Sequence, residues 1–372
     1  MTSSAPPSAR GVLVTGGAGY IGSHAVLALL DAGLRPVILD DLSTGSAASV
    51  PPGVTLIRGS TGDSRLVTNI ARLHDIDSVL HFAASLVVPD SVREPIRYWR
   101  NNLGNTAALL EGCVEAGISR IVFSSTAAVY GLSDEPGVSE DTPTAPINPY
   151  GASKLATERL LADAAAAHDL RVVALRYFNV AGADPLGRAG QRTRGATHLI
   201  KVACEAATGQ RPGMDVFGTD YDTPDGTCVR DFIHVSDLAD AHVLALDYLR
   251  NGGRSDTMNC GYGSGSSVRE VIAAVERASN RRITATAKPR RPGDPPSLVA
   301  NGARIRDRLG WTPRHTDLDD IVSTSLRWER RMQDERQAID AAVPAAPVGR
   351  PAAQPIPFDR HPRPARPIRF TV

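Results

Sequence analysis

A tyrosine and a lysine four residues apart, Tyr150 and Lys154, have the types and spacing in this sequence best suited to chemistry. In a helix that spacing places both side chains on one face, about one turn apart. A cation held beside a phenol favours the phenolate and lowers the phenol's pKa from about 10 toward neutrality. A phenolate that forms near neutral pH can take a proton from an alcohol or sugar hydroxyl. Such pairs also occur on ordinary solvated helices, so the hypothesis needs support from elsewhere in the chain.

A glycine-rich segment near the start of the chain gives that support. Gly16, Gly19 and Gly22 follow an apolar run and precede a helical stretch. Such a loop lets the backbone approach a pyrophosphate, while the N-terminus of the helix faces the anion. Asp40 and Asp41 end the next apolar run, where a carboxylate can accept a hydrogen bond from a ribose 2′-hydroxyl and would repel a 2′-phosphate. The segment predicts a dinucleotide site that prefers NAD to NADP.

Apolar runs alternate with helical stretches through the first half of the chain. They lack polar alternation, which is typical of strands buried on both faces. This pattern predicts a Rossmann-type, doubly wound α/β fold with a parallel sheet. The expected strands span residues 11–15, 36–40, 54–57, 78–82, 120–124 and 171–176.

The sequence predicts two folded parts between two tails. The NAD-binding Rossmann domain is expected at residues 11–180, with later segments near 228–260 returning to it. A smaller, irregular C-terminal lobe for the substrate is expected at 181–227 and 261–335. Residues 1–10 are expected to form a flexible tail. The Pro/Arg-rich segment 343–372 cannot bury enough apolar surface to offset its ordering entropy, so we expect disorder there.

The bulk composition excludes several classes of function. The 372 residues are 42% hydrophobic and 22% charged, with a formal net charge of +1, so no global field favours nucleic acid or an anionic membrane. No apolar run approaches the roughly 20 residues needed to span a bilayer. The N-terminus lacks the apolar core of a signal peptide, which makes the cytoplasm the expected location. The four cysteines are far apart, and no metal site is predicted.

Three longer runs carry a resemblance to a known family. They are residues 14–24, 175–179 and 226–240, the last beginning Gly-Thr-Cys-Val-Arg-Asp-Phe-Ile-His-Val. With them, the chain resembles the extended short-chain dehydrogenase/reductase superfamily and, within it, the UDP-glucose 4-epimerase family, over about residues 11 to 333. The resemblance implies epimerisation at C4 of UDP-glucose or UDP-galactose through a transient 4-keto sugar and NADH. NAD would stay tightly bound and be regenerated in each turnover.

The resemblance also implies roles for individual residues. Tyr150 would act as base and acid on the sugar 4-hydroxyl, Lys154 would bind the nicotinamide ribose and lower the tyrosine's pKa, and Thr126 would bond the 4-oxygen. The expected cofactor-binding residues are Gly16, Gly19, Tyr20, Ile21, Gly22, Asp40, Asp41, Phe82, Ala83, Ala84, Asn101, Ser124, Tyr150, Lys154 and Tyr177. The expected UDP-sugar contacts are Thr126, Tyr150, Asn179, His198, Leu199, Phe217, Arg230, Arg291, Asp294 and Leu298, with the two arginines on the diphosphate.

Several positions depart from the family pattern. Ser60 stands where an Asp commonly holds the adenine, with Asp63 as a displaced candidate, and Leu86 stands where some members carry a cofactor-binding lysine. His198 replaces an asparagine beside the nucleotide. Leu298 occupies a position that often carries a bulky tyrosine, so the smaller side chain could admit an N-acetyl group.

The residues support other possible functions of the same fold to different degrees. A UDP-N-acetylhexosamine or UDP-pentose 4-epimerase stays open. Dehydration is disfavoured because Ala127 and Ala128 follow Thr126, where dehydratases of this superfamily carry an acid pair. A catalytically silent NAD- or nucleotide-binding regulator ranks lower, because the Tyr, Lys and Thr are all present. A homodimer is expected through helices near 91–117 and 151–169, with neither nucleic acid nor membrane as a partner.

Overall fold

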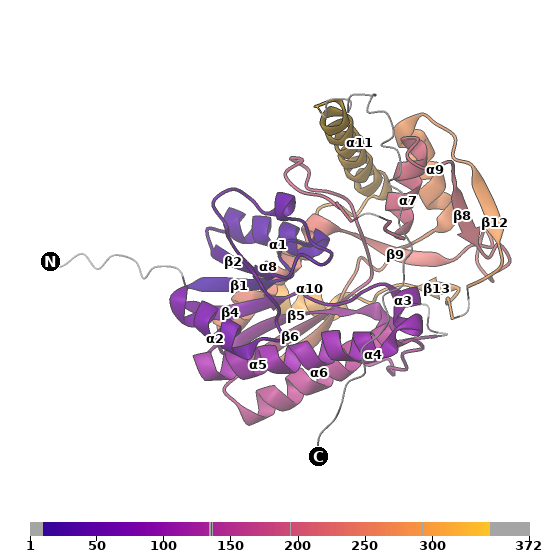
Figure 1. The fold of residues 1–372 in the computed structure, drawn as a ribbon. Coiled ribbons are helices and arrows are strands. Elements are labelled where there is room, and N and C mark those ends of the chain that lie inside the picture. Colours follow the sequence, from indigo (N-terminus) through magenta and orange to yellow (C-terminus); the bar gives the residue numbers. More distant parts are fainter. Residues whose placement is uncertain (1–9, 134, 136, 194, 292, 343–372) are drawn as a thin grey trace, which may run out of the picture. The chain divides into compact units, whose positions relative to one another are not determined.

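Seven parallel strands form the main sheet (Figure 1). They are β1 (Gly11–Thr15), β2 (Arg35–Asp40), β3 (Thr55–Arg58), β4 (Ile76–His81), β5 (Arg120–Thr126), β6 (Arg171–Tyr177) and β10 (Asp256–Cys260). Their order is β10-β6-β5-β4-β1-β2-β3, so the chain runs outward from β1 to β3 and then crosses back to β4 on the other side of β1. Dinucleotides bind at such a reversal, outside the carboxyl ends of the strands. The predicted Rossmann-type α/β fold is confirmed.

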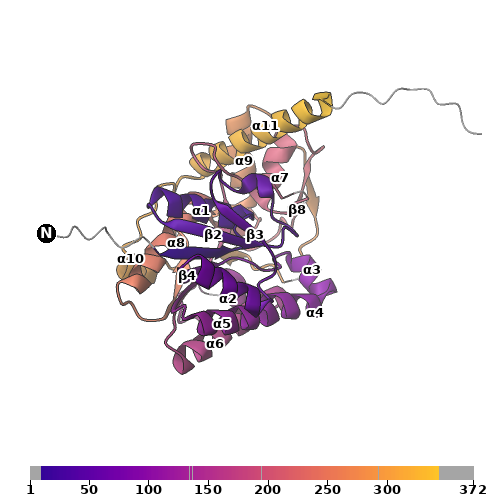
Figure 2. The same ribbon diagram turned by 60° about the vertical axis from the view of Figure 1, so that its left-hand side comes forward.

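Helices cover both faces of this sheet (Figure 2). One face carries α1 (Tyr20–Asp31), α8 (Val235–Arg250) and α10 (Ala303–Leu309), and the other carries α2 (Ser64–Leu73), α5 (Asn105–Ala116) and α6 (Pro149–Ala167). Successive strand residues point to opposite faces. Val12 and Val14 therefore pack with α1 and α8, while Leu13 packs with Leu109 of α5 and Leu161 of α6. Burial on both faces explains why these strands read as continuous apolar runs.

Two small sheets lie beside the main one. The first contains β7 (Asn179–Ala181), β9 (Val229–His234), β11 (Gly265–Ser267) and β13 (Ser297–Leu298), and the second pairs β8 (Met214–Phe217) with β12 (Ala285–Lys288). Helices α7 (Leu199–Ala207) and α9 (Val268–Ser279) share a separate apolar core with the start of α11 (Leu318–Ala342). These elements form the smaller C-terminal part that the sequence predicted.

The chain passes between the two parts more than once. After β9 it returns to the main sheet as α8 and β10, and it then leaves again for β11. The segment Asp256–Cys260 is thus the outer strand of the main sheet, beside β6. Within the range 228–260, β9 lies in the small sheet with β7, β11 and β13, whereas α8 and β10 lie with the main sheet.

The computed structural model describes residues 10–133, 135, 137–193, 195–291 and 293–342. Almost all of the two predicted tails lies outside these residues. Among the described residues, those as far as Gln333 form one compact unit, and those from Asp334 onward belong to a second. Among the described helices, none is both long enough and apolar enough to cross a membrane.

Candidate active site

The glycine loop connects β1 to α1 at the carboxyl edge of the sheet. Gly16 has φ +71°, a conformation that favours glycine, and its N–H donates to the carbonyl of Leu39 at 2.9 Å. A Cβ on Gly16 would lie 2.7 Å from the backbone nitrogen of Ala83, which follows β4. A Cβ on Gly22 would lie 2.2 Å from the Gly16 carbonyl oxygen. The first and third glycines are therefore required by close contacts between backbone segments.

The start of α1 fits a dinucleotide phosphate. Gly19 is the N-cap, and within the described residues no side chain caps this helix and no acidic residue lies in its first turn. Backbone N–H groups at a helix start attract anions, since they lack partners in the helix and carry the positive end of its dipole. Tyr20, Ile21 and Gly22 form that first turn. The loop therefore retains the donors that a pyrophosphate needs.

The two predicted acids after β2 differ in their surroundings. Asp40 is buried, and its carboxylate accepts the N–H of Ala18 at 2.9 Å and of Leu42 at 2.8 Å, so it braces the glycine loop. Burial raises the pKa of Asp40 above its usual value, while the two backbone N–H groups act in the opposite direction. Asp41 is exposed and accepts the N–H and the hydroxyl of Ser43 at 2.8 and 2.6 Å.

Helix α6 brings the predicted catalytic pair to the ends of β5 and β6. Asn148 caps the helix by accepting the N–H of Gly151 at 2.9 Å, which places Tyr150 in its first turn. Lys154 lies one turn further along, and its Nζ donates to the backbone carbonyl of Ser124 at 2.7 Å. The phenol of Tyr150 hydrogen-bonds the hydroxyl of Thr126, the last residue of β5. The structure thus brings Tyr150, Lys154, Thr126 and Ser124 together.

Burial dominates the electrostatics of this pair. It raises the pKa of Tyr150 to about 12, against a smaller lowering by the hydrogen bond from Thr126. Burial also lowers the pKa of Lys154 to about 7, against the attraction of Glu158. We expected the lysine to lower the pKa of the phenol. Lys154 is not among the groups that shift the pKa of Tyr150; its Nζ is bonded to the Ser124 carbonyl, and burial disfavours its own charged form.

Two aromatic residues complete the edge of the sheet. The hydroxyl of Tyr177, at the end of β6, hydrogen-bonds the side chain of Ser124, and burial raises the pKa of Tyr177 above its usual value. Phe82 follows β4, and its ring centroid lies 4.6 Å from that of His242 on α8. Both side chains are partly buried.

A turn of π-helix, residues 99–104, fixes the loop after β4. Asn101, a predicted cofactor contact, donates to the hydroxyl of Ser85 at 3.0 Å. Asn102 was missed by the sequence reasoning, although it is buried and binds the backbone N–H and carbonyl of Ser85 at 2.7 and 3.0 Å. It also donates to Ser153 of α6 at 2.9 Å. The doubled asparagine at 101–102 is the signal in the sequence that could have indicated this contact.

The predicted UDP-sugar residues lie on the smaller sheets and near α7. Arg230 of β9 stands opposite Leu298 of β13 in the strand register, and its guanidinium lies 3.8 Å from the carboxylate of Asp294. Arg291 is stacked on the ring of Phe217, with its guanidinium carbon 3.8 Å from the ring centroid. Each arginine therefore contacts another residue of the chain. The diphosphate that each is predicted to bind would be a further contact.

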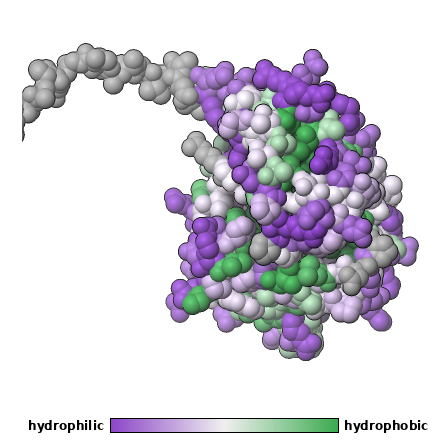
Figure 3. Space-filling model, turned by 90° about the vertical axis from the view of Figure 1, so that its right-hand side faces the viewer, coloured by the Kyte–Doolittle hydropathy of each residue, from purple (hydrophilic) through white to green (hydrophobic). Residues whose placement is uncertain are grey.

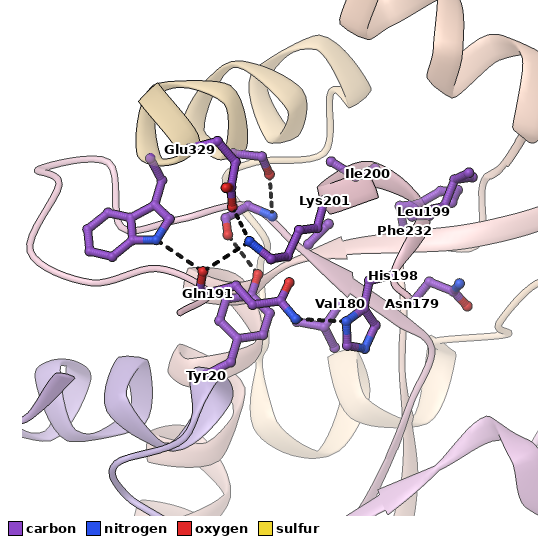
Figure 4. Close-up of a pocket in the computed structure, with 14 residues that line it drawn as sticks. Tyr20, Asn179, Val180, Gln191, His198, Leu199, Ile200, Lys201, Phe232 and Glu329 are labelled. Atoms are coloured by element: carbon purple, nitrogen blue, oxygen red, sulfur yellow. Dashed lines mark hydrogen bonds and ion pairs between the residues drawn. The ribbon is translucent and has the colours of Figure 1, made fainter. Parts of the chain in front are cut away.

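Three other predicted contacts line one small pocket (Figure 4). Asn179 starts β7, His198 precedes α7, and Leu199 is the first residue of α7. The Nδ1 atom of His198 is hydrogen-bonded to the side-chain amide of Gln191 at 2.8 Å. Tyr20, from the glycine loop, lines the same pocket. Arg230, Arg291, Phe217, Asp294 and Leu298 are not among its lining residues.

Comparison with known proteins shows which family this chain belongs to. The model of the NAD dependent epimerase/dehydratase family matches residues 12–261. The chain belongs to the NAD dependent epimerase/dehydratase family. The family predicted from the sequence is thereby confirmed, and NAD is the cofactor that this family uses.

Individual relatives match nearly the whole folded chain. A UDP-glucose 4-epimerase of Azospirillum brasilense is 58% identical over 350 residues, which are 94% of this chain and 100% of the relative. The crystal structure of a UDP-glucose 4-epimerase from Brucella ovis in complex with NAD is 43% identical, with a TM-score of 0.84 over 86% of this chain and 98% of that one. One from Bifidobacterium longum in complex with NAD⁺ and UDP is 37% identical, with a TM-score of 0.82 over 87% of this chain and 99% of that one.

The departures of this chain from the epimerase pattern have structural counterparts. The hydroxyl of Ser60 accepts the N–H of Gly62 at 3.1 Å. Asp63 caps α2 by accepting the N–H of Leu66 at 3.0 Å, so its carboxylate stabilises a helix start. Leu86 is half exposed and cannot replace the lysine contact of other members.

Proposed function

We propose that this epimerase-family chain is an NAD-dependent UDP-glucose 4-epimerase. The observation that carries the proposal is the cluster of Tyr150, Thr126 and Lys154 at the carboxyl ends of β5 and β6, on the same sheet edge as the glycine loop. The predicted activity agrees with the names of the relatives above, one of which shares 58% of its residues over its whole length.

Separate residues of the chain bind the cofactor and transfer the proton in this proposal. When bound, NAD supplies the group that accepts a hydride from C4 of the sugar and returns it. In this proposal the glycine loop and the open start of α1 hold the pyrophosphate, and Lys154, whose Nζ donates to the Ser124 carbonyl, hydrogen-bonds the ribose. Tyr150 takes the proton of the 4-hydroxyl and later returns it, while Thr126 holds the phenol in place through its hydroxyl.

Inversion at C4 requires a sugar that can turn over while its nucleotide stays fixed. The diphosphate provides the anchor, because binding energy from a non-reacting part of the substrate can orient the reacting part. Arg230 suits this role, because a guanidinium can contact a phosphate through two hydrogen bonds. Its guanidinium lies 3.8 Å from the carboxylate of Asp294, and its backbone pairs with Leu298 in the small sheet that contains β9.

A panel of UDP-sugars tests the proposal directly. The purified protein, without added NAD, should interconvert UDP-glucose and UDP-galactose with no net NADH absorbance, since the hydride returns in each turnover. UDP-xylose, UDP-arabinose and the N-acetylated pair belong in the same panel. A protein that retained NAD but converted none of these sugars would instead support the silent nucleotide-binding regulator.

A second candidate activity rests on Leu298. This side chain is half-buried and packs against the apolar cluster that contains Tyr130 and Phe178. We propose that it leaves room for a 2-acetamido group, so that UDP-N-acetylglucosamine is also converted. The values of kcat/KM on the two sugar pairs test this, and Leu298→Tyr should lower only the value for the acetylated pair. Discrimination above about a thousandfold in the unaltered protein, roughly 4 kcal/mol, would contradict it.

We also propose that the chain forms a homodimer in the cytoplasm. Exposed apolar side chains gather on and beside α3 (Val88–Arg93) and α4 (Pro95–Tyr98); they are Leu86, Val88, Val92, Ile96 and Trp99. Figure 3 shows the face that carries β8, β12 and β13, with apolar side chains in separate patches in its upper and lower halves. Such patches mark contact surfaces. The four free, buried cysteines suit a reducing compartment. Light scattering that gave a monomer at micromolar concentration would contradict the dimer.

A further inference from the structure

The phenol of Tyr20 contacts a segment of the chain outside the glycine loop that carries it. Its hydroxyl donates to the backbone carbonyl of Gly182 at 2.7 Å, across 162 residues of sequence. Its ring meets that of His24, one turn along α1, edge to face at 5.4 Å between centroids. Burial, with a smaller effect of Glu329, raises the pKa of Tyr20 well above its usual value, so the phenol stays protonated and remains a donor.

Gly182, the acceptor of this hydrogen bond, is fixed from several sides. Its φ is +93°, and a Cβ there would lie 2.6 Å from the imidazole of His234. Its N–H donates to the hydroxyl of Ser325 on α11 at 2.9 Å. Because the backbone is held in this way, a displacement of the Gly182 carbonyl also displaces the strand that precedes it.

That strand is β7, which carries the predicted substrate contact Asn179. It pairs with β9 in parallel register, with Ala181 opposite His234, and β9 carries Arg230. The path from the cofactor loop to the UDP-sugar contacts is therefore one side-chain hydrogen bond followed by a paired strand. Paired strands are stiff over such short lengths, because each residue is held by the ladder.

The pocket that Tyr20 lines is too small to hold a nucleotide (Figure 4). It has a volume of about 30 Å³, enough for about one water molecule. Its buried Lys201 is paired with Glu329 and with Glu205, and its Nζ also donates to the carbonyl of Gln191 at 3.4 Å. The polar groups around the phenol of Tyr20 thus form hydrogen bonds and ion pairs with other residues of the chain. The phenol lies at a packed contact between segments of the chain.

We propose that Tyr20 is a positioning residue that couples the cofactor loop to the substrate strands. An α1 start that is ordered by NAD would hold Gly182, and through β7 it would hold Asn179 and Arg230 in the arrangement that binds UDP. The inference rests on the proposed function for the identity of the ligand. Coupling between two sites is reciprocal, so bound UDP would strengthen the hold on NAD by the same factor.

Calorimetric titration of the NAD-loaded protein with UDP tests the coupling. Tyr20→Phe keeps the ring and its contact with His24 and removes the donor. We expect the Kd for UDP and the KM for the UDP-sugar to rise about five- to tenfold, the value of one hydrogen bond. Bound NAD per chain is measured for each variant and the titration is expressed per NAD-loaded chain; a fall in kcat larger than the rise in KM would count against a positioning role. An unchanged Kd would overturn the proposal.

Two further variants separate coupling from a loss of stability. Tyr248→Phe also removes one bond between a phenol and the backbone, at the N–H of Arg254, and should leave the Kd for UDP unchanged. An equal weakening in Tyr248→Phe would overturn the proposal. Ser325→Ala removes the other hydrogen bond at Gly182, so its effect on the Kd should be less than additive with Tyr20→Phe. Full additivity would also overturn it. Failure of the unaltered protein to bind UDP would count against the proposed function, independently of Tyr20.

Discussion

At the scale of single residues, Tyr150 is a base whose surroundings oppose its ionisation. Burial places its pKa near 12, and the lysine one turn away has a pKa near 7 and is bonded to a backbone carbonyl. Both groups are therefore largely uncharged in the protein alone at slightly alkaline pH. Thr126 is the neighbour whose hydrogen bond favours the phenolate. Among the groups that act on the phenol, this hydrogen bond is the one that favours loss of its proton.

Replacing Tyr150 by phenylalanine should separate chemistry from binding. The ring still fills its place in the first turn of α6, but no proton acceptor remains. We expect kcat to fall by at least about a hundredfold, with NAD content and UDP affinity largely retained. Steady-state rates on UDP-galactose, NAD extraction and UDP titration measure the three quantities. Near-normal turnover would rule out Tyr150 as the base.

At the scale of elements, the third glycine of the loop sets how closely α1 approaches β1. Gly22→Ala would place a methyl group 2.2 Å from the Gly16 carbonyl, which forces the backbone of the loop to move. We expect at least a tenfold loss of NAD affinity, because the phosphate donors at the helix start move with the loop.

A glycine with more room is the control for this change. A Cβ on Gly137 meets its nearest neighbour, the Ala300 carbonyl, at 3.8 Å, an ordinary van der Waals contact. Gly137→Ala should therefore keep the NAD content of the unaltered protein. NAD retention after extensive dialysis compares the two variants, and full retention in Gly22→Ala would contradict the close-contact explanation.

Helix α2 gives a prediction about the displaced acid. Asp63 caps this helix, so Asp63→Ala should lower the free energy of unfolding by about 1 kcal/mol. NAD content should not change if capping is the main role of this carboxylate. Urea unfolding and NAD extraction measure the two effects. A large loss of NAD with little loss of stability would instead assign Asp63 to the adenine.

The sequence could predict the elements because their signals are local. Apolar runs, the glycine spacing and the Tyr150–Lys154 interval each lie within a few residues, and each gave the correct strand, loop or helix. The doubled asparagine could have indicated a contact at Asn102, but its partners Ser85 and Ser153 could not be predicted, because the three segments meet only in the folded chain. The pKa of Tyr150 was missed for the same reason, since burial depends on everything packed around the phenol.

At the scale of the whole molecule, four buried histidines should make the protein sensitive to acid. Burial is the largest cause that lowers the pKa of each, to about 3 for His81 and about 4 for His24, His234 and His242. The unfolded chain would bind protons near pH 6.5, whereas the folded protein would not. The free energy of unfolding is therefore fully present above pH 6.5 and falls as the pH drops toward 4.

Urea unfolding at pH 7 and pH 5.5 measures this dependence. The four groups together should lower the free energy of unfolding by roughly 5 kcal/mol at most over that interval. His242→Leu should make the dependence shallower by about a quarter, whereas His168→Gln, at an exposed position, should leave it unchanged. A urea midpoint that did not move with pH would contradict the prediction.

The return of the chain to the main sheet after β9 has a consequence for how such a protein can be divided. A fragment that ended at residue 180 would lack α8 and β10, which leaves β6 with an open edge and uncovers the apolar side of α1. Open edges and uncovered apolar helices promote aggregation. The cofactor half and the sugar half are therefore not interchangeable modules, and a graft of new substrate specificity must replace loops between shared strands rather than exchange one end of the chain.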